Sequence, residues 1–314
     1  MERKTAGWPF RAYQQKYNKG KAMAQKLKGK VAVVTGAGSS VGVGREVALA
    51  MATEGASVVV NDIRYDSNGI RGADRVVEDI RRAKGTAVAN YDSVATMSGG
   101  ENIIKTALSN FGRIDILVNT AGNVRNIPIT EMTEDDWDAV IDVHLKGHFS
   151  CTKPAVAEMI KQKSGRVINF SSRAAFLFSR ADLSQPSGGL MALSYATAKA
   201  GILGFTTALA SGLMEFGITV NAILPSAVTD LFKPQRPRWF GGGDTESPEF
   251  VAPVIVYLAT DEAKDITGQF IYSCAGDICI FDRPMQLPGP HRFIRKIGKW
   301  TIEELNEVIP PLVK

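Results

Sequence analysis

Short apolar runs alternate along this chain with segments whose apolar residues recur every three or four positions. The runs are rich in Val and Ile and predict seven strands, over residues 31–35, 57–61, 86–90, 114–119, 166–171, 219–224 and 269–273. The periodic segments predict helices over 45–54, 101–111 and 134–161, and a further helix that carries Tyr195 and continues toward Glu215. Strands and helices therefore alternate through most of the sequence.

This alternation favours an α/β fold built on one parallel sheet. Right-handed crossovers place helices on both faces, which gives a doubly wound, three-layer α/β/α domain. Ligands in such sheets bind beyond the carboxyl ends of the strands. The residues that fall at these ends are Asp62, Asp92, Asn119, Ser172 and Pro225. Because no internal repeat is visible, we expect a single domain.

The first predicted strand leads directly into a glycine-rich loop and a helix. The loop contains Thr35, Gly36, Gly38, Ser40, Val41, Gly42 and Gly44. Glycine permits positive φ and close backbone approach, so a pyrophosphate can bind the N–H groups at a helix N-terminus. An ordinary loop has the same composition. Asp62, at the end of the second strand, favours a dinucleotide site because an acid there can bind ribose hydroxyls.

Tyr195 and Lys199 lie four residues apart on a predicted helix. This spacing places both side chains on one face, where an ammonium favours the ionised form of a phenol and makes it a usable acid or base. The same spacing also occurs between solvated helix neighbours. The pair becomes informative together with the nucleotide motifs upstream.

With these motifs in order, residues 30–281 resemble the short-chain dehydrogenase/reductase family. The motifs are Thr35-Gly36 with its loop, Asp92, Asn119-Thr120-Ala121-Gly122, Ser171-Ser172, Tyr195 to Lys199, and Pro225 to Thr229. The resemblance implies a Rossmann-type fold, a nicotinamide cofactor and hydride transfer at a secondary alcohol. Three features are more similar to the 3-hydroxyacyl-CoA dehydrogenase domains of multifunctional β-oxidation enzymes and their bacterial relatives: Val143 to Gly147, the Asn61-Asp62 pair and the tail around Trp300.

The resemblance also implies roles for single residues. Ser172, with Ser171 as the alternative, would hydrogen-bond the substrate oxygen, Tyr195 would take the alcohol proton, and Lys199 would lower the phenol pKa and hold the nicotinamide ribose. The positions implied to bind the cofactor are Thr35, Gly36, Gly38, Ser40, Val41, Gly42, Asp62, Asp92, Asn119, Ala121, Gly122, Tyr195, Lys199, Pro225, Val228 and Thr229.

The chain departs from the family pattern at several positions. The glycine loop has two more residues than usual between Thr35 and the helix, and Thr120 replaces the customary second asparagine. His144 stands where many members have a catalytic asparagine, so it is either a proton relay or a satisfied buried histidine.

Two segments near the expected site differ from the family in length. Residues 173–194 form an apolar insertion between Ser172 and Tyr195, placed to shape a substrate pocket. The segment 231–247, where the family keeps a mobile lid, is short and rich in Gly, Pro and Arg.

Charge is unevenly distributed over the 314 residues. The net charge is +5, but residues 1–28 carry +7, so the remainder carries −2. The basicity therefore belongs to an arm, and we expect no nucleic-acid partner. The arm lacks a secretory apolar core and has no serine. We expect a cytoplasmic homodimer or homotetramer whose arm packs on a subunit or on its own domain, with a solvated leader as the alternative.

The remaining composition is that of a soluble enzyme with three regions: 1–28, a catalytic domain over 29–282, and an extension over 283–314. In the extension, Thr301 and Glu304 form a capping box for a short helix. The uncharged apolar stretch after Lys199 is too short to span a membrane. The three cysteines have no metal-ligand spacing, so we expect no metal.

Cofactor and substrate follow from the same residues. Asp62 favours NAD over NADP because a carboxylate repels the 2′-phosphate, whereas Arg64 has the opposite effect. The first candidate substrate is a 3-hydroxyacyl-CoA thioester, and the alternative is a cyclic, aryl or steroid-like secondary alcohol. A hypothesis of another class is a catalytically silent subunit that binds nucleotide, which the presence of Ser172, Tyr195 and Lys199 disfavours.

Overall fold

The computed structural model describes residues 25–66, 68–175, 193–231, 247–274 and 277–281. The chain divides into two compact units, residues 1–281 and 282–314, and the second lies outside the described residues. Nearly all of the basic arm, the short helix expected near Thr301 and most of the two segments of unusual length also lie outside them.

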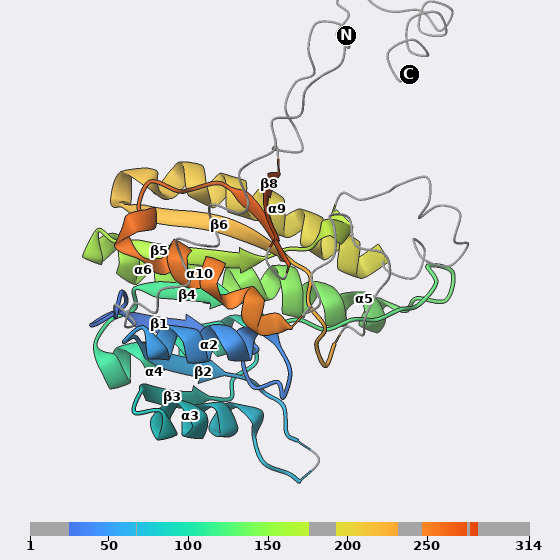
Figure 1. Ribbon diagram of the computed structural model, residues 1–314. Helices are drawn as coiled ribbons and strands as arrows, with labels where there is room; N and C mark the ends of the chain where they lie inside the picture. The colour runs from blue at the N-terminus through green and yellow to red at the C-terminus, as the bar shows by residue number, and fades with distance from the viewer. Residues whose placement is uncertain (1–24, 67, 176–192, 232–246, 275–276, 282–314) are drawn as a thin grey trace, which may run out of the picture. The chain divides into compact units, whose positions relative to one another are not determined.

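One sheet organises the first unit (Figure 1). Its strands are β1 (Val31–Val34), β2 (Ser57–Asn61), β3 (Thr86–Asn90), β4 (Ile116–Asn119), β5 (Gly165–Phe170), β6 (Ile218–Pro225), β7 (Phe270–Cys274) and β8 (Asp277–Phe281). They lie in the order β3-β2-β1-β4-β5-β6-β7-β8. The chain runs outward in both directions from β1 and β4, and this reversal of strand order creates the crevice where doubly wound sheets bind ligands.

All seven predicted strands are present within two residues of their expected bounds, and every pair among them is parallel. The sheet is not wholly parallel, however, because β8 pairs with β7 in the antiparallel sense. Only residues 275–276 separate these two strands, and a parallel crossover needs a dozen residues or more. The expected three-layer α/β fold is confirmed with this correction.

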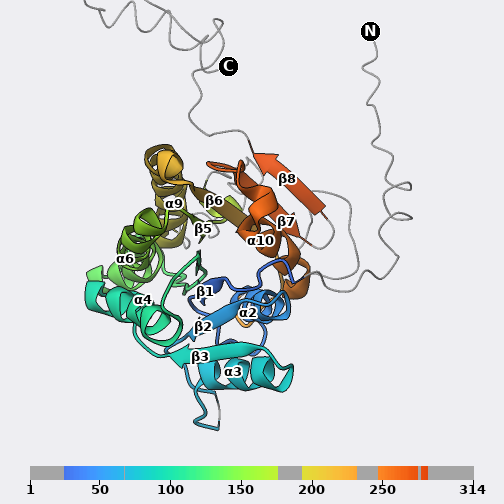
Figure 2. The same ribbon diagram turned by 90° about the vertical axis from the view of Figure 1, so that its left-hand side faces the viewer.

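Helices cover both faces of the sheet (Figure 2). On one face lie α2 (Val43–Thr53), α3 (Gly72–Arg82) and α10 (Ala252–Ala259), and on the other lie α4 (Met97–Phe111), α6 (Gly147–Gln162) and α9 (Leu193–Leu213). The α5 helix (Glu134–Ile141) precedes α6. Short 3₁₀ turns occur at Arg173–Ala175, Met214–Phe216, Pro248–Phe250 and Asp261–Ala263.

The alternation of side chains along each strand divides the core into two layers. Val34, Val58 and Val60 pack with α2, α3 and α10, whereas Val33 and Val59 face α4, α6 and α9. All five side chains are buried. Because the central strands are covered on both faces, they appear in the sequence as continuous apolar runs rather than as alternating patterns.

The helix predicted over 134–161 is interrupted. A π-helical turn, Asp142–Lys146, separates α5 from α6 and contains His144. Such turns occur inside helices, frequently at functional sites, and are invisible to periodicity. The start of α4 also lies earlier than predicted, because Thr96 caps it by accepting a hydrogen bond from the Gly99 N–H at 3.0 Å.

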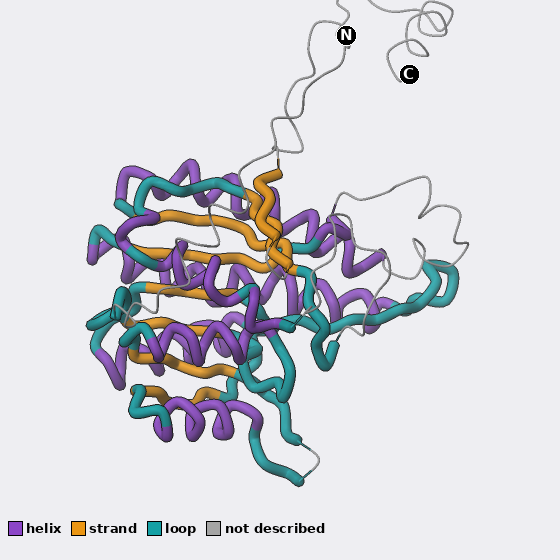
Figure 3. The backbone as a smooth tube through the Cα atoms, in the orientation of Figure 1, coloured by secondary structure: helices purple, strands orange, loops and turns teal. Residues whose placement is uncertain are grey.

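Long loops follow the carboxyl ends of the strands (Figure 3), as the position of the expected site requires. Among the described helices, none has the length and apolarity needed to cross a bilayer.

Candidate active site

The glycine loop is packed tightly against the end of β4. Gly36 has a φ of +64°, and a Cβ there would lie 2.6 Å from the Ala121 Cα. A Cβ on Gly44 would lie 2.6 Å from the Thr120 Oγ1. Thr35 reinforces this packing, since its Oγ1 accepts hydrogen bonds from the N–H groups of Thr120 and Ala121 at 3.1 and 3.2 Å. Thr35 is buried, so its side chain supports the loop rather than facing a ligand.

The loop fits a dinucleotide phosphate. Gly42 caps α2 without a side-chain hydrogen bond, so the first N–H groups of α2 have no intrahelical acceptor and are available to an anion. A Cβ on Gly38 would lie 2.7 Å from the Asp62 Cβ, which explains why glycine occupies this position. The N–H groups of Ser40 and Val41 are directed elsewhere, toward the carboxylate of Asp230 at 3.0 and 3.1 Å.

Asp62 lies just beyond β2, as predicted, but it is already engaged. Its Oδ2 accepts hydrogen bonds from the Gly38 N–H at 2.8 Å and from Arg64 Nη2 at 2.8 Å, and its Oδ1 accepts from Arg64 Nε at 3.0 Å. Burial opposes ionisation of Asp62, but the hydrogen bonds and charge of Arg64 outweigh it and hold the pKa below its usual value. Asp62 is therefore a carboxylate at neutral pH, with a half-exposed guanidinium beside it.

Two predicted cofactor residues take part in internal polar networks. Asn119 is buried, and its Nδ2 donates to Thr152 Oγ1 at 3.1 Å and to Asn169 Oδ1 at 3.0 Å. This placement gives the Asn119 side chain a structural role, and cofactor binding at this position stays a prediction. Asp92 accepts hydrogen bonds from Asn90 and Asn102 at 2.8 and 3.1 Å, so it secures the end of β3 beside the crevice.

Tyr195 and Lys199 come together with Ser172, as the sequence predicts. The Lys199 Nζ lies 5.5 Å from the centroid of the Tyr195 ring and donates to the Phe170 carbonyl oxygen at 2.6 Å. Ser172 hydrogen-bonds the Tyr195 side chain. Ser171 instead donates to the Lys199 carbonyl oxygen at 2.7 Å and is buried, so Ser172 is the better placed of the two serines.

The pKa values of this pair differ from the expectation. Burial raises the pKa of Tyr195 to about 12, against the hydrogen bond with Ser172, which lowers it. Burial also lowers the pKa of Lys199 to about 7. The expected lowering of the phenol pKa by Lys199 is therefore not observed, since loss of hydration disfavours the charged forms of both side chains.

His144 packs against the catalytic tyrosine. Its ring meets that of Tyr195 edge to face, with centroids 5.3 Å apart and an interplanar angle of 89°. The Nε2 atom lies 3.0 Å from the Asn123 nitrogen and 2.8 Å from the Asn123 oxygen, while the buried Nδ1 finds no partner among the described residues. Burial, followed by the charge of Lys199, holds its pKa well below the usual value, so the ring is neutral.

Gly122 makes room for this ring. A Cβ at position 122 would lie 2.5 Å from the His144 Cε1, so the glycine is required for the fit. Cofactor binding at Gly122 stays a prediction. The fit of the His144 ring is a separate reason why glycine occupies this position.

His148 was not singled out from the sequence, yet it joins the elements that hold the catalytic side chains. Its Nδ1 lies 2.5 Å from the His144 carbonyl oxygen, and its Nε2 accepts a hydrogen bond from the Phe170 N–H at 3.3 Å. The carbonyl of the same Phe170 holds Lys199. Burial lowers the pKa of His148 to about 3, so it stays neutral and can both donate and accept. In the sequence, the only indication of this role is that His148 lies four residues after His144.

The segment after β6 completes the edge of the site. Pro225 ends the strand beside Ser273 of β7, and Val228 and Thr229 follow, both half-buried. The Thr229 Oγ1 accepts a hydrogen bond from the Leu231 N–H at 3.2 Å. The next residue, Asp230, is the one that contacts the glycine loop.

Comparison with known proteins agrees with this geometry. The family model described as short chain dehydrogenase matches residues 30–238. Peroxisomal multifunctional enzyme type 2 of Drosophila melanogaster is 40% identical over 252 residues, which is 79% of this chain and 39% of that protein. This chain therefore spans well under half the length of that relative.

Two other similar proteins are of comparable length to this chain. A subunit of (2S)-[(R)-hydroxy(phenyl)methyl]succinyl-CoA dehydrogenase from Thauera aromatica is 36% identical over 80% of this chain and 97% of its own. The crystal structure of a short chain dehydrogenase from Mycobacterium avium superposes with a TM-score of 0.78 at 38% identity, covering 91% of this chain and 95% of its own.

Proposed function

This chain belongs to the short chain dehydrogenase family, and from that premise we propose that it interconverts a secondary alcohol and a ketone with NAD. Family membership makes it an oxidoreductase that acts on CH–OH groups with a nicotinamide cofactor. The observation that carries the proposal is the convergence of Ser172, Tyr195 and Lys199 at the end of β5, beside a glycine loop that fits a phosphate.

The nicotinamide, when bound, supplies the chemistry of hydride acceptance and return. Ser172 positions the substrate oxygen by donating a hydrogen bond to it. Tyr195 exchanges the proton of the alcohol. With its pKa near 7, Lys199 gains a proton in the physiological range and then places a positive charge beside the phenol, which favours phenolate. His144 and His148 keep these groups in place by packing and by backbone hydrogen bonds.

For the substrate we favour a 3-hydroxyacyl-CoA thioester. The resemblance to multifunctional β-oxidation enzymes supports it, and the Thauera relative is named for a CoA thioester that bears an aryl secondary alcohol. A cyclic, aryl or steroid-like alcohol without CoA is the alternative. NAD is favoured over NADP because Asp62 is ionised at the end of β2.

A substrate screen tests this proposal. NADH formation should appear with 3-hydroxyacyl-CoA thioesters and exceed that with simple aryl, cyclic or steroid alcohols. Activity confined to the alcohols would replace the thioester. Binding of NADH without turnover of any substrate would favour the catalytically silent subunit.

Two further expectations stay predictions. A homodimer or homotetramer is supported by Ile278 and Ile280, which are 63% and 54% exposed on the edge strand β8, and analytical ultracentrifugation measures it. The cytoplasmic location is testable by cell fractionation.

A further inference from the structure

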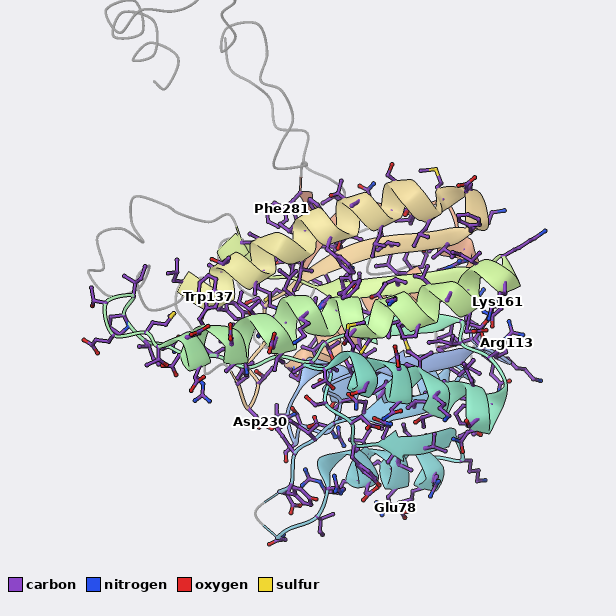
Figure 4. All side chains as sticks on the ribbon, turned by 180° about the vertical axis from the view of Figure 1, so that it is seen from behind. Glu78, Arg113, Trp137, Lys161, Asp230 and Phe281 are labelled. Atoms are coloured by element: carbon purple, nitrogen blue, oxygen red, sulfur yellow. The ribbon has the colours of Figure 1, made fainter. Side chains whose placement is uncertain are left out.

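The glycine loop is tied to the segment after β6 by three hydrogen bonds. The Asp230 Oδ2 accepts from the N–H groups of Ser40 and Val41 at 3.0 and 3.1 Å, and the Asp230 N–H donates to the Val41 carbonyl oxygen at 2.9 Å. We call this contact, made by Ser40, Val41 and Asp230, the clasp. Figure 4 shows Asp230 at the same end of the molecule as Trp137, opposite the end that holds Arg113 and Lys161.

The clasp spans the crevice of the sheet. It joins the loop after β1 to the segment after β6, and the strands β4 and β5 lie between these two in the sheet. Three strand spacings of about 4.8 Å separate β1 from β6, or about 14 Å. Gly122 follows the end of β4, and Ser172 follows the end of β5. The clasp therefore connects two loops across the place where a dinucleotide lies in this fold.

The clasp is a long-range contact. Its two donor N–H groups belong to Ser40 and Val41, between Gly38 and Gly42, and they bind a carboxylate that is 190 and 189 residues away along the chain.

Asp230 leaves the phosphate donors of α2 untouched. Helix α2 begins at Val43, after the residues of the clasp, and no side chain caps it. The carboxylate of Asp230 and a phosphate would therefore use different N–H groups. Arg64 also lies close enough to Asp230 for their charges to interact, in addition to its stronger bond with Asp62, and this cation offsets repulsion between the two anions.

We propose that the clasp is a gate for the dinucleotide, held shut by Asp230, which must open each time the cofactor enters or leaves. This inference rests on the proposed nicotinamide cofactor. The clasp uses protein atoms only and separate phosphate donors remain, so it is closed in both the free and the bound protein. A barrier common to both directions slows association and dissociation by the same factor and leaves the Kd unchanged.

Stopped-flow binding of NADH to the full-length protein tests the gate. Asp230→Asn removes the charge from the acceptor and weakens its two N–H bonds. We expect the association and dissociation rate constants each to rise by about tenfold, with the Kd within about twofold of wild type. Asp265→Asn, at an exposed aspartate near the amino ends of the strands, should change neither rate.

A second variant tests whether the acceptor oxygens of residue 230 hold the clasp. Asp230→Ala removes both oxygens as well as the charge, so it should raise both rate constants at least as much as Asp230→Asn does. If Asp230→Asn lowered the Kd by raising only the association rate constant, the carboxylate would be competing with phosphate, and the gate would be overturned. Unchanged rates, or a higher Kd through dissociation alone, would also overturn it. Failure of the wild type to bind NADH or NADPH would instead reject the cofactor.

Discussion

The catalytic corner around Tyr195 and the nucleotide corner around the glycine loop lie at the same edge of one sheet, but they are built differently. In the catalytic corner, buried side chains bond to backbone groups of strands and helices, as Lys199 does to Phe170. In the nucleotide corner, hydrogen bonds join one loop to another, and both Asp230 and Arg64 remain substantially exposed. Proton transfer needs shifted pKa values and hence burial, whereas exchange of a cofactor needs contacts that can open.

The electrostatics of the two corners differ in the same sense. Burial dominates the first, where it raises the pKa of Tyr195 and lowers that of Lys199. At Asp62, burial also disfavours the charge, but the hydrogen bonds and charge of Arg64 reverse the outcome. Substitutions in the catalytic corner should therefore affect turnover and pH dependence, and those in the nucleotide corner should affect affinity and binding rates.

The largest expected effect is that of Tyr195→Phe. Removal of the hydroxyl eliminates the proposed proton transfer, so kcat should fall by about 10² or more. The Kd for NADH, measured by fluorescence titration, should stay within about threefold of wild type. Tyr257→Phe, at a half-exposed tyrosine of α10, is the matched control. A kcat within threefold of wild type for Tyr195→Phe would remove Tyr195 from its role.

Lys199→Met should change the pH dependence of stability. Between a folded pKa of about 7 and the ordinary value of 10.5, the unfolded chain keeps a proton that folded Lys199 has lost. The free energy of unfolding of the wild type therefore rises with pH in this window, by about 1.4 kcal/mol per pH unit where the difference is a full proton. Lys199→Met lacks this contribution and should be the more stable protein near pH 7.

Urea denaturation at several values between about pH 8 and 9.5 measures the effect, below the range in which Tyr195 titrates. The stability advantage of Lys199→Met should shrink as the pH rises. Lys161→Met, on the exposed surface of α6, is the control and should run parallel to the wild type. If the free energies of unfolding of Lys199→Met and the wild type differed by the same amount at every pH, burial would not shift the pKa of Lys199.

The two corners also differ in how far the sequence predicts them. Tyr195 and Lys199 share a helix, so their spacing alone places them on one face, and the ends of apolar runs locate Ser172 and Asp62. By contrast, Asp230 reaches Ser40 from 190 residues away, and no local pattern encodes that contact. The π-helical turn at His144 and the inward orientation of Asn119 depend on packing between elements, which periodicity does not contain. Strand β8 was not predicted as a separate strand, because only residues 275–276 separate it from β7.

The smallest expected effect concerns Arg64 and the choice between NAD and NADP. Its guanidinium partly offsets the charge of Asp62, and it is half-exposed, so screening by water and salt limits its influence. Arg64→Ala should lower kcat/KM with NADP more than with NAD, and we expect the preference for NAD to grow by about three- to tenfold. Arg82→Ala, on the exposed surface of α3, removes an arginine away from this site and should leave the ratio unchanged.

If Arg64 serves only to orient Asp62 for the ribose, Arg64→Ala would lower kcat/KM with NAD more than with NADP. Because both results are ratios measured on one variant, the sign of the change decides between a guanidinium that attracts the 2′-phosphate and one that only positions a carboxylate.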